Sequence, residues 1–165
     1  MSYATQLVVN NILERSFRDE CFITPSKLQR IMYIATSEYH KASESSLISE
    51  VFEPWESGPI LLSIRQHFLP LGGSPITRYI RDADGNALEC DERADPHLQR
   101  ALDTAWAATA HRDHITLSQI TRTEGSAWWK AVQDGEAFMS DDDILEDTTY
   151  CTPLGIMPAG ATTND

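Results

Sequence analysis

The stretch from Glu50 to Ile60, EVFEPWESGPI, constrains the fold more than any other part of the chain. Pro54 cannot donate a backbone hydrogen bond, and it pushes the residue before it toward extended geometry. Gly58 permits backbone angles that other residues avoid, and Pro59 suits the first position of a helix. These properties predict a chain that arrives extended, turns sharply beside Trp55 and begins a helix at Pro59. From the residues alone, a structural corner around a core tryptophan is favoured over a binding feature.

Amphipathic patterns predict helices on both sides of this corner. Apolar residues recur at helical spacing from Tyr3 to about Arg18, and again in a helix that begins at Pro25 behind an N-cap at Thr24. A short strand is expected at residues 51–52, and further helices are expected over residues 59–68, 96–109, 116–120, 126–135 and from 140. The sequence therefore predicts a mainly α fold, a compact single-domain helical bundle with a small β-hairpin or short sheet.

Two segments outside these helices carry their own signals. An Asp84-Gly85 pair lies between two β-prone runs, residues 76–81 and 87–90, which is typical of a hairpin. From Cys151 onward the composition shifts to Pro, Gly, Ala and Thr. Residues 1–150 are therefore expected to form the folded domain, and residues 151–165 a flexible or loosely docked tail with a sticky apolar segment at 154–157.

Charge and cysteine content limit the classes of partner. The chain has 165 residues, with 25 Asp and Glu against 13 Lys and Arg, a net charge of −12. This balance argues against nucleic-acid binding and fits a basic protein partner. Three widely spaced cysteines indicate reduced thiols, and the N-terminal residues do not form a signal-peptide pattern, so a cytoplasmic location is expected. No apolar run approaches the roughly 20 residues of a membrane helix, so no membrane association is expected.

Patterns for chemistry are weak. His111 and His114 share helical spacing, but a zinc site needs four convergent ligands. A nucleophile would require Cys90 or Cys21 to meet a histidine in space, and no local pattern supports that. The acidic run at residues 141–143 fits the first turn of a helix better than a calcium loop. We therefore expect no enzyme, no metal and no cofactor, with an enzyme built on Cys90 as the least favoured hypothesis.

The tryptophan pair Trp128-Trp129 is a candidate for partner recognition, because tryptophan is enriched at binding hot spots. Neighbouring side chains on a helix point about 100° apart, so we expect one of the two to be buried and the other to lie at a groove or surface. A helix-turn-helix across residues 116–132 would present only Lys130 as a cation from its second helix, which disfavours DNA binding.

Three segments together resemble the Panacea domain family, which contains SocA-like antitoxins and GepA-like phage-associated proteins. Residues 24–33 (TPSKLQRIMY), 52–60 (FEPWESGPI) and 121–131 (TRTEGSAWWKA) are similar, in order and separation, to the family's KLQKLLYF helix, EAWxxGPV turn and THxExPWxxA motif. The resemblance covers about residues 3–150. The chain departs from the family at Pro54, which replaces alanine, at Arg122, where histidine is usual, and at Ala127, where proline is common.

The resemblance implies a toxin-antitoxin system in which this chain neutralises a cognate toxin by direct contact. One relative delivers its toxin to a ClpXP-type protease, which gives the alternative of a proteolytic adaptor. The expected partners are thus a toxin, basic by charge complementarity, and under the alternative a protease, while self-association into a homo-oligomer is compatible with both. The rigid corner would position the second helix, and the expected partner-binding residues are Gln29, Arg30, Tyr33, Trp55, Gly58, Pro59, Trp128 and Trp129.

Overall fold

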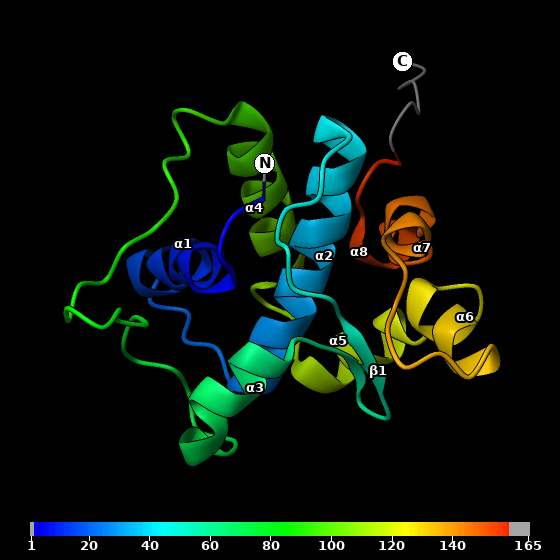
Figure 1. Ribbon diagram of the computed structural model, residues 1–165, viewed down its shortest axis with the longest axis horizontal. Helices are drawn as coiled ribbons and strands as arrows, with labels where there is room; N and C mark the ends of the chain where they lie inside the picture. Colours follow the sequence, from blue (N-terminus) through cyan, green and yellow to red (C-terminus); the bar gives the residue numbers. More distant parts are fainter. Residues whose placement is uncertain (1, 159–165) are drawn as a thin grey trace.

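The long helix α2 (Pro25–Ser43) runs through the centre of the computed structural model, which describes residues 2–158 (Figure 1). Helices α3 (Leu62–Phe68), α4 (Pro96–Thr109), α5 (His114–Thr121) and α7 (Asp141–Glu146) pack around it, together with strand β2 (Gly58–Ile60). Helix α1 (Thr5–Arg18) packs on α3 and α4, and α6 (Ala127–Gln133) packs on α7 and strand β1 (Glu53–Trp55). A short 3-10 turn η1 (Leu69–Leu71) extends α3. The prediction of a mainly α, single-domain fold with a small sheet is confirmed.

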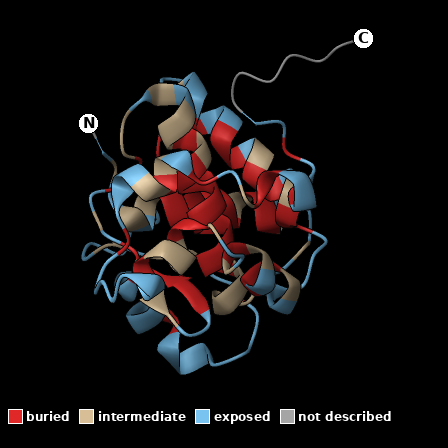
Figure 2. Cartoon of the chain, turned by 90° about the vertical axis from the view of Figure 1, so that its right-hand side faces the viewer, coloured by how far each residue is buried: buried red, intermediate tan, exposed pale blue. Residues whose placement is uncertain are grey.

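Burial of α2 is not restricted to one face. Figure 2 shows the buried segments gathered at the middle of the molecule. Leu28, Ile31 and Met32 are buried there, and so are the polar residues Arg30 and Tyr33. A helix covered on all sides is expected to be apolar all round. Since α2 is not, each of its polar side chains needs a partner inside the protein.

Four helices begin where the predicted ranges place their starts. The side chains of Thr24, Asp95, Ser126 and Ser140 each accept a hydrogen bond from a backbone N–H in the first turn that follows. The start predicted at Thr116 is wrong, because Asp113 accepts from the Thr116 N–H at 2.7 Å and α5 begins at His114. An upstream aspartate thus caps the helix in place of the threonine.

The predicted helix start at Pro59 is also wrong. Residues 58–60 form β2, which pairs antiparallel with β1 so that Pro54 lies opposite Pro59 and Trp55 opposite Gly58. Both prolines are tolerated because a two-stranded sheet consists only of edge strands. The strand expected at residues 51–52 begins two residues later, at Glu53, and α3 begins only at Leu62.

No hairpin strands form on either side of Asp84-Gly85 within the described residues 76–90. The turn itself is present, since the Asp82 N–H donates to the Asn86 carbonyl at 2.9 Å. The flanking segments are bound by α1 instead: Asn10 Nδ2 donates to the carbonyls of Ile80 and Leu88, both at 2.8 Å. Asparagine side chains of α1 therefore take backbone groups that strand pairing would have used.

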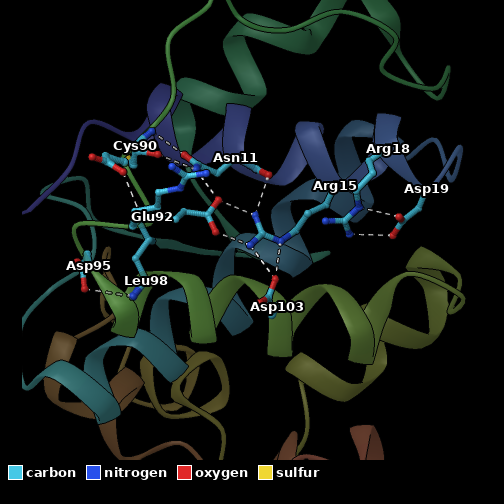
Figure 3. A network of polar contacts seen from close by, with 11 residues as sticks. Asn11, Arg15, Arg18, Asp19, Cys90, Glu92, Asp95, Leu98 and Asp103 are labelled. Atoms are coloured by element: carbon cyan, nitrogen blue, oxygen red, sulfur yellow. Dashed lines mark hydrogen bonds and ion pairs between the residues drawn. The ribbon is translucent and has the colours of Figure 1, made fainter.

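A buried ion network fixes the next part of this loop (Figure 3). Arg15 of α1, with only 3% of its side chain exposed, contacts Glu92 at 2.5 Å and Asp103 of α4 at 2.8 Å. Asn11 Nδ2 also donates to Glu92 at 2.7 Å. Burial raises the pKa of Glu92, but the hydrogen bonds from Arg15 and Asn11 outweigh it and the net pKa is lowered. Arg15 thus joins α1, the loop and α4.

The expectation of a flexible or loosely docked tail is wrong for its first residues. Residues Cys151–Leu154 form α8, and Cys151, Leu154 and Ile156 are buried, while Met157 is exposed. The apolar residues of this segment pack into the core, so most of the apolar segment predicted at 154–157 is not available to bind a partner. Residues 159–165 of the predicted tail lie outside the described residues.

Arg15→Met tests the ion network. The change leaves the carboxylate of Glu92 partly buried without its cation, so the free energy of unfolding should fall by about 2–4 kcal/mol. Urea denaturation at neutral pH measures the difference. The control is Arg18→Met on the same helix, because the Arg18–Asp19 pair is exposed and should leave stability nearly unchanged. Equal losses for both variants would contradict the structural role of Arg15.

The same pair predicts a pH dependence. The lowered pKa of Glu92 means that its contribution is complete above the usual value of 4.5 and is lost as pH falls through the lower folded-state value. The stability difference between the unchanged chain and Arg15→Met should therefore be constant near neutral pH and shrink in acid. A difference that stays constant down to acid unfolding would contradict this assignment.

Candidate functional site

A small cavity of about 170 Å³ lies where the start of α2 meets α3 and the hairpin formed by β1 and β2. It is the hollow that brings together several residues singled out from the sequence. Its lining includes Gln29, Arg30, Trp55, Ser57, Ile60 and Arg65. The lining combines apolar surface with two guanidinium groups, in a chain whose net charge is −12.

Arg30 is the unusual residue of this site. Its side chain is fully buried, its Nη1 donates to the Pro59 carbonyl at 2.5 Å, and its Nε donates to Ser118 Oγ at 3.1 Å. Within residues 2–158, the remaining nitrogen, Nη2, has no hydrogen-bond partner, and no carboxylate forms an ion pair with Arg30. Burial, with a smaller effect of Arg122, lowers its pKa to about 10, so the guanidinium stays protonated at neutral pH.

Gly58 allows the hairpin to lie directly against this guanidinium. Its φ of +131° is one that side-chain-bearing residues rarely adopt. A Cβ atom there would stand 2.6 Å from Nη1 and 2.8 Å from Cζ of Arg30. The sequence predicts the need for glycine at the turn, but the reason for it is the close approach of Arg30 as well as the backbone angle.

Gln29 fixes the other end of the hairpin. Its Oε1 accepts from the Leu61 N–H at 2.9 Å, and its Nε2 donates to the Leu61 carbonyl at 3.0 Å. The Gln29 side chain thus makes with Leu61 the two backbone hydrogen bonds that a neighbouring strand would otherwise make. Leu61 is the N-cap of α3, so Gln29 sets the point at which β2 ends and the helix begins.

Five of the eight expected partner-binding residues are buried. Tyr33 has no exposed surface and its hydroxyl donates to the Asp147 carboxylate. Gln29, Arg30, Gly58 and Pro59 are buried as well. Gln29, Arg30 and Tyr33, which the sequence places near the contact surface, lie inside the protein, because α2 is covered on that side by the β1–β2 hairpin and the C-terminal elements. Their role in partner binding stays a prediction.

The remaining three expected residues are all tryptophans, and they lie on β1 and α6, which pack against each other. Trp55 is half-buried and carries the Arg65 guanidinium over its ring at 4.6 Å. Trp128 Nε1 donates to the Trp55 carbonyl at 2.6 Å, which joins α6 to the hairpin. Trp128 packs against the core, but it and Trp129 are both half-buried, so the expectation that one of the pair is buried and the other lies at a groove or surface does not hold for the buried one. Helix α6 lies at the edge of the molecule (Figure 1).

Three site residues were missed from the sequence: Arg65, Ser118 and Arg122. Arg122 Nε donates to the Ser118 carbonyl at 3.1 Å, and its Nη1 donates to the Glu56 carbonyl at 3.2 Å in the hairpin turn. Ser118 therefore contacts both Arg30 and Arg122. The single sequence signal for any of them is that Arg122 departs from the family's histidine, and here it holds the hairpin turn against α5.

The cysteine named in the enzyme hypothesis is unsuited to nucleophilic attack. Cys90 is buried, and burial is the main cause that raises its pKa to about 12, so the thiol stays protonated at neutral pH. Its backbone N–H is bound by Asn11 Oδ1 at 2.8 Å. Across residues 2–158, no group of three or more His, Cys, Asp or Glu side chains could hold a metal ion. In the same residues, no helix combines the length and apolar character needed to cross a membrane.

Comparison with family models, curated proteins and solved structures found no match for this chain. The Panacea resemblance thus stays a prediction from three motifs. The structure adds that these motifs, far apart in the sequence, form one contiguous unit. Arg30 binds Pro59, Trp128 binds Trp55, and Arg122 binds Glu56.

Gly58→Ala should destabilise the protein by about 3 kcal/mol or more, since the new methyl group meets both backbone strain and the Arg30 guanidinium. Gly155→Ala is the matched control. Gly155 also has positive φ, at +70°, in the left-handed helical region, and nothing in the described chain lies within 4 Å of its added Cβ, so a loss of about 1–2 kcal/mol is expected. Thermal or urea denaturation compares the two, and similar losses would show that contact with Arg30 is unimportant.

Proposed function

We propose that this chain is a protein-binding module that acts as an antitoxin and covers a cognate toxin. The contact area is the surface that we call the hairpin–α6 surface, formed by Trp55, Trp128, Trp129, Val132 and Phe138. The observation that carries the proposal is that these large apolar side chains remain partly exposed on segments that pack against one another. Tryptophan-rich surface of this kind is typical of binding hot spots.

The contacts that assemble this surface come from three segments. Trp128 binds the carbonyl of Trp55, and the Met139 N–H donates to the Phe52 carbonyl at 2.8 Å, which places Phe138 next to the start of β1. Phe138 is 58% exposed and Val132 is 42% exposed. Trp129 and Val132 are three residues apart on α6 and so share a face of that helix.

Charge supports a basic toxin as the partner. Glu56, Asp134 and Glu136 are exposed around the hairpin–α6 surface, and the whole chain carries a net charge of −12. Complementary charge of this kind accelerates association and orients the partners. The three-motif resemblance to Panacea antitoxins supports the same role, because two of the motifs supply the tryptophans of this surface.

The decisive experiment co-expresses this chain with the product of its neighbouring gene. The unchanged chain should restore growth and form a complex in a pull-down. The double variant Trp129→Ala/Phe138→Ala should weaken binding at least about tenfold and lose rescue, because it removes two partly exposed aromatic side chains from this surface. Leu88→Ala is the control, since Leu88 is also exposed, at 53%, but belongs to the loop between η1 and α4. Figure 1 shows this loop on the other side of α2 from α6.

Two outcomes would contradict the proposal. One is a toxic neighbour that stays lethal and does not bind the chain. The other is an equal loss of binding in the Leu88→Ala control, which would show that binding does not depend on the hairpin–α6 surface. Toxin half-life distinguishes the two ways of neutralising: masking leaves the half-life unchanged or longer, whereas delivery to a ClpXP-type protease shortens it.

A further inference from the structure

We propose that the cavity between α2, the hairpin and α3 binds a carboxylate group, with Arg30 as the buried cation and Arg65 at the rim. The proposal stands apart from the antitoxin proposal, because it concerns a ligand of this chain alone. It assigns a use to the one side-chain polar atom in residues 2–158 that is buried without a hydrogen-bond partner, Nη2 of Arg30.

The first argument is energetic. A buried charge normally has a partner, because leaving it unpaired costs several kcal/mol, and buried polar atoms without hydrogen bonds are rare in folded proteins. The protein has 25 acidic residues, yet none in the described chain pairs with Arg30. The cation is instead held by two neutral oxygens, those of Pro59 and Ser118, which fix its position without neutralising it.

The second argument is the shape and lining of the cavity. Arg30 lines it together with the exposed Arg65, whose guanidinium stacks on Trp55. Two guanidinium groups give a local positive field in an acidic chain, and guanidinium geometry matches carboxylate oxygens. The volume of about 170 Å³ accommodates a small group, and the apolar contributions of Trp55 and Ile60 suit a ligand with an apolar body.

A singly charged ligand fits better than a doubly charged one. One carboxylate neutralises the buried Arg30, whereas the second charge of a phosphate dianion would have to be balanced by Arg65, which is exposed to water and lies over the Trp55 ring. The carboxylate can belong to a free organic acid or to the C-terminus of a peptide. Both present the same group, so the experiment has one arm for each.

The test titrates the full chain with sodium benzoate, with N-acetyl-Leu-Leu as the free acid, with the corresponding amide, and with inorganic phosphate at matched ionic strength. Calorimetry gives the dissociation constants, and the ¹⁵N-resolved Nε–Hε signal of Arg30 reports contact at the site. We expect a carboxylate to shift this signal and the amide to leave it in place. Tighter binding of the peptide acid identifies a chain end as the ligand source, and tighter binding of benzoate identifies a free acid.

Three variants locate the effect. Arg30→Lys keeps a charge but loses the planar fork, so carboxylate binding should weaken by about tenfold or more. Arg65→Gln changes only an exposed side chain and should weaken binding about threefold without affecting folding. Arg93→Gln, which removes an exposed charge from the loop before α4, should have no effect. Arg65→Gln keeps the test decisive if Arg30→Lys fails to fold.

The proposal is overturned if neither carboxylate shifts the Arg30 signal, or if phosphate binds and both carboxylates do not. It is also overturned if Arg93→Gln weakens binding as much as Arg65→Gln, because the effect would then follow net charge rather than the cavity. The antitoxin proposal is untouched by any of these results, since rescue by the hairpin–α6 surface is measured separately.

Discussion

The burial of α2 on all sides is the constraint on which the rest of the structure depends. Its polar residues Gln29, Tyr33, Ser37 and Lys41 follow one another at four-residue spacing and so form a stripe along one face. Gln29 binds Leu61, Tyr33 binds Asp147, Ser37 Oγ donates to the Ile144 carbonyl at 2.8 Å, and Lys41 Nζ donates to the Tyr150 hydroxyl at 2.8 Å. A buried polar group left unpaired costs about 1–3 kcal/mol, so this stripe decides where each later segment docks.

Arg30 lies next to this stripe in the sequence of α2, but within the described residues not all of its side-chain nitrogens have a hydrogen-bond partner. The polar side chains of the stripe are paired by the segments that cover them, whereas Arg30 keeps an unpaired nitrogen and a net charge. Folding alone would favour an apolar residue of similar volume at such a place. Strained or unsatisfied groups that persist in a stable fold are concentrated at functional sites. Arg30 is therefore more informative about ligand binding than the paired polar residues of α2 are.

The features that could be predicted from the sequence are those set by interactions between residues close together in the chain. The caps at Thr24, Asp95, Ser126 and Ser140 each act within three residues, and the helices they begin were predicted correctly. The helix at Pro59 was not, because Gln29 and Arg30, some thirty residues earlier, bind the backbone of Leu61 and Pro59 and hold it extended. Trp55 and Gly58 could be predicted because they belong to one short motif. Arg65 and Ser118 could not, because only the folding of distant segments brings them to the site.

The hairpin links the cavity to the hairpin–α6 surface. Two strands of three residues are too small to be stable by themselves, so the hairpin takes its rigidity from its neighbours. It is held from α2 by Arg30, from α5 by Arg122 and from α6 by Trp128. Trp55 belongs to both places, with its ring against Arg65 at the cavity and its carbonyl bound to Trp128 at the surface. A surface fixed in this way loses little conformational entropy when a partner binds, which favours recognition by a preformed aromatic area over folding upon binding.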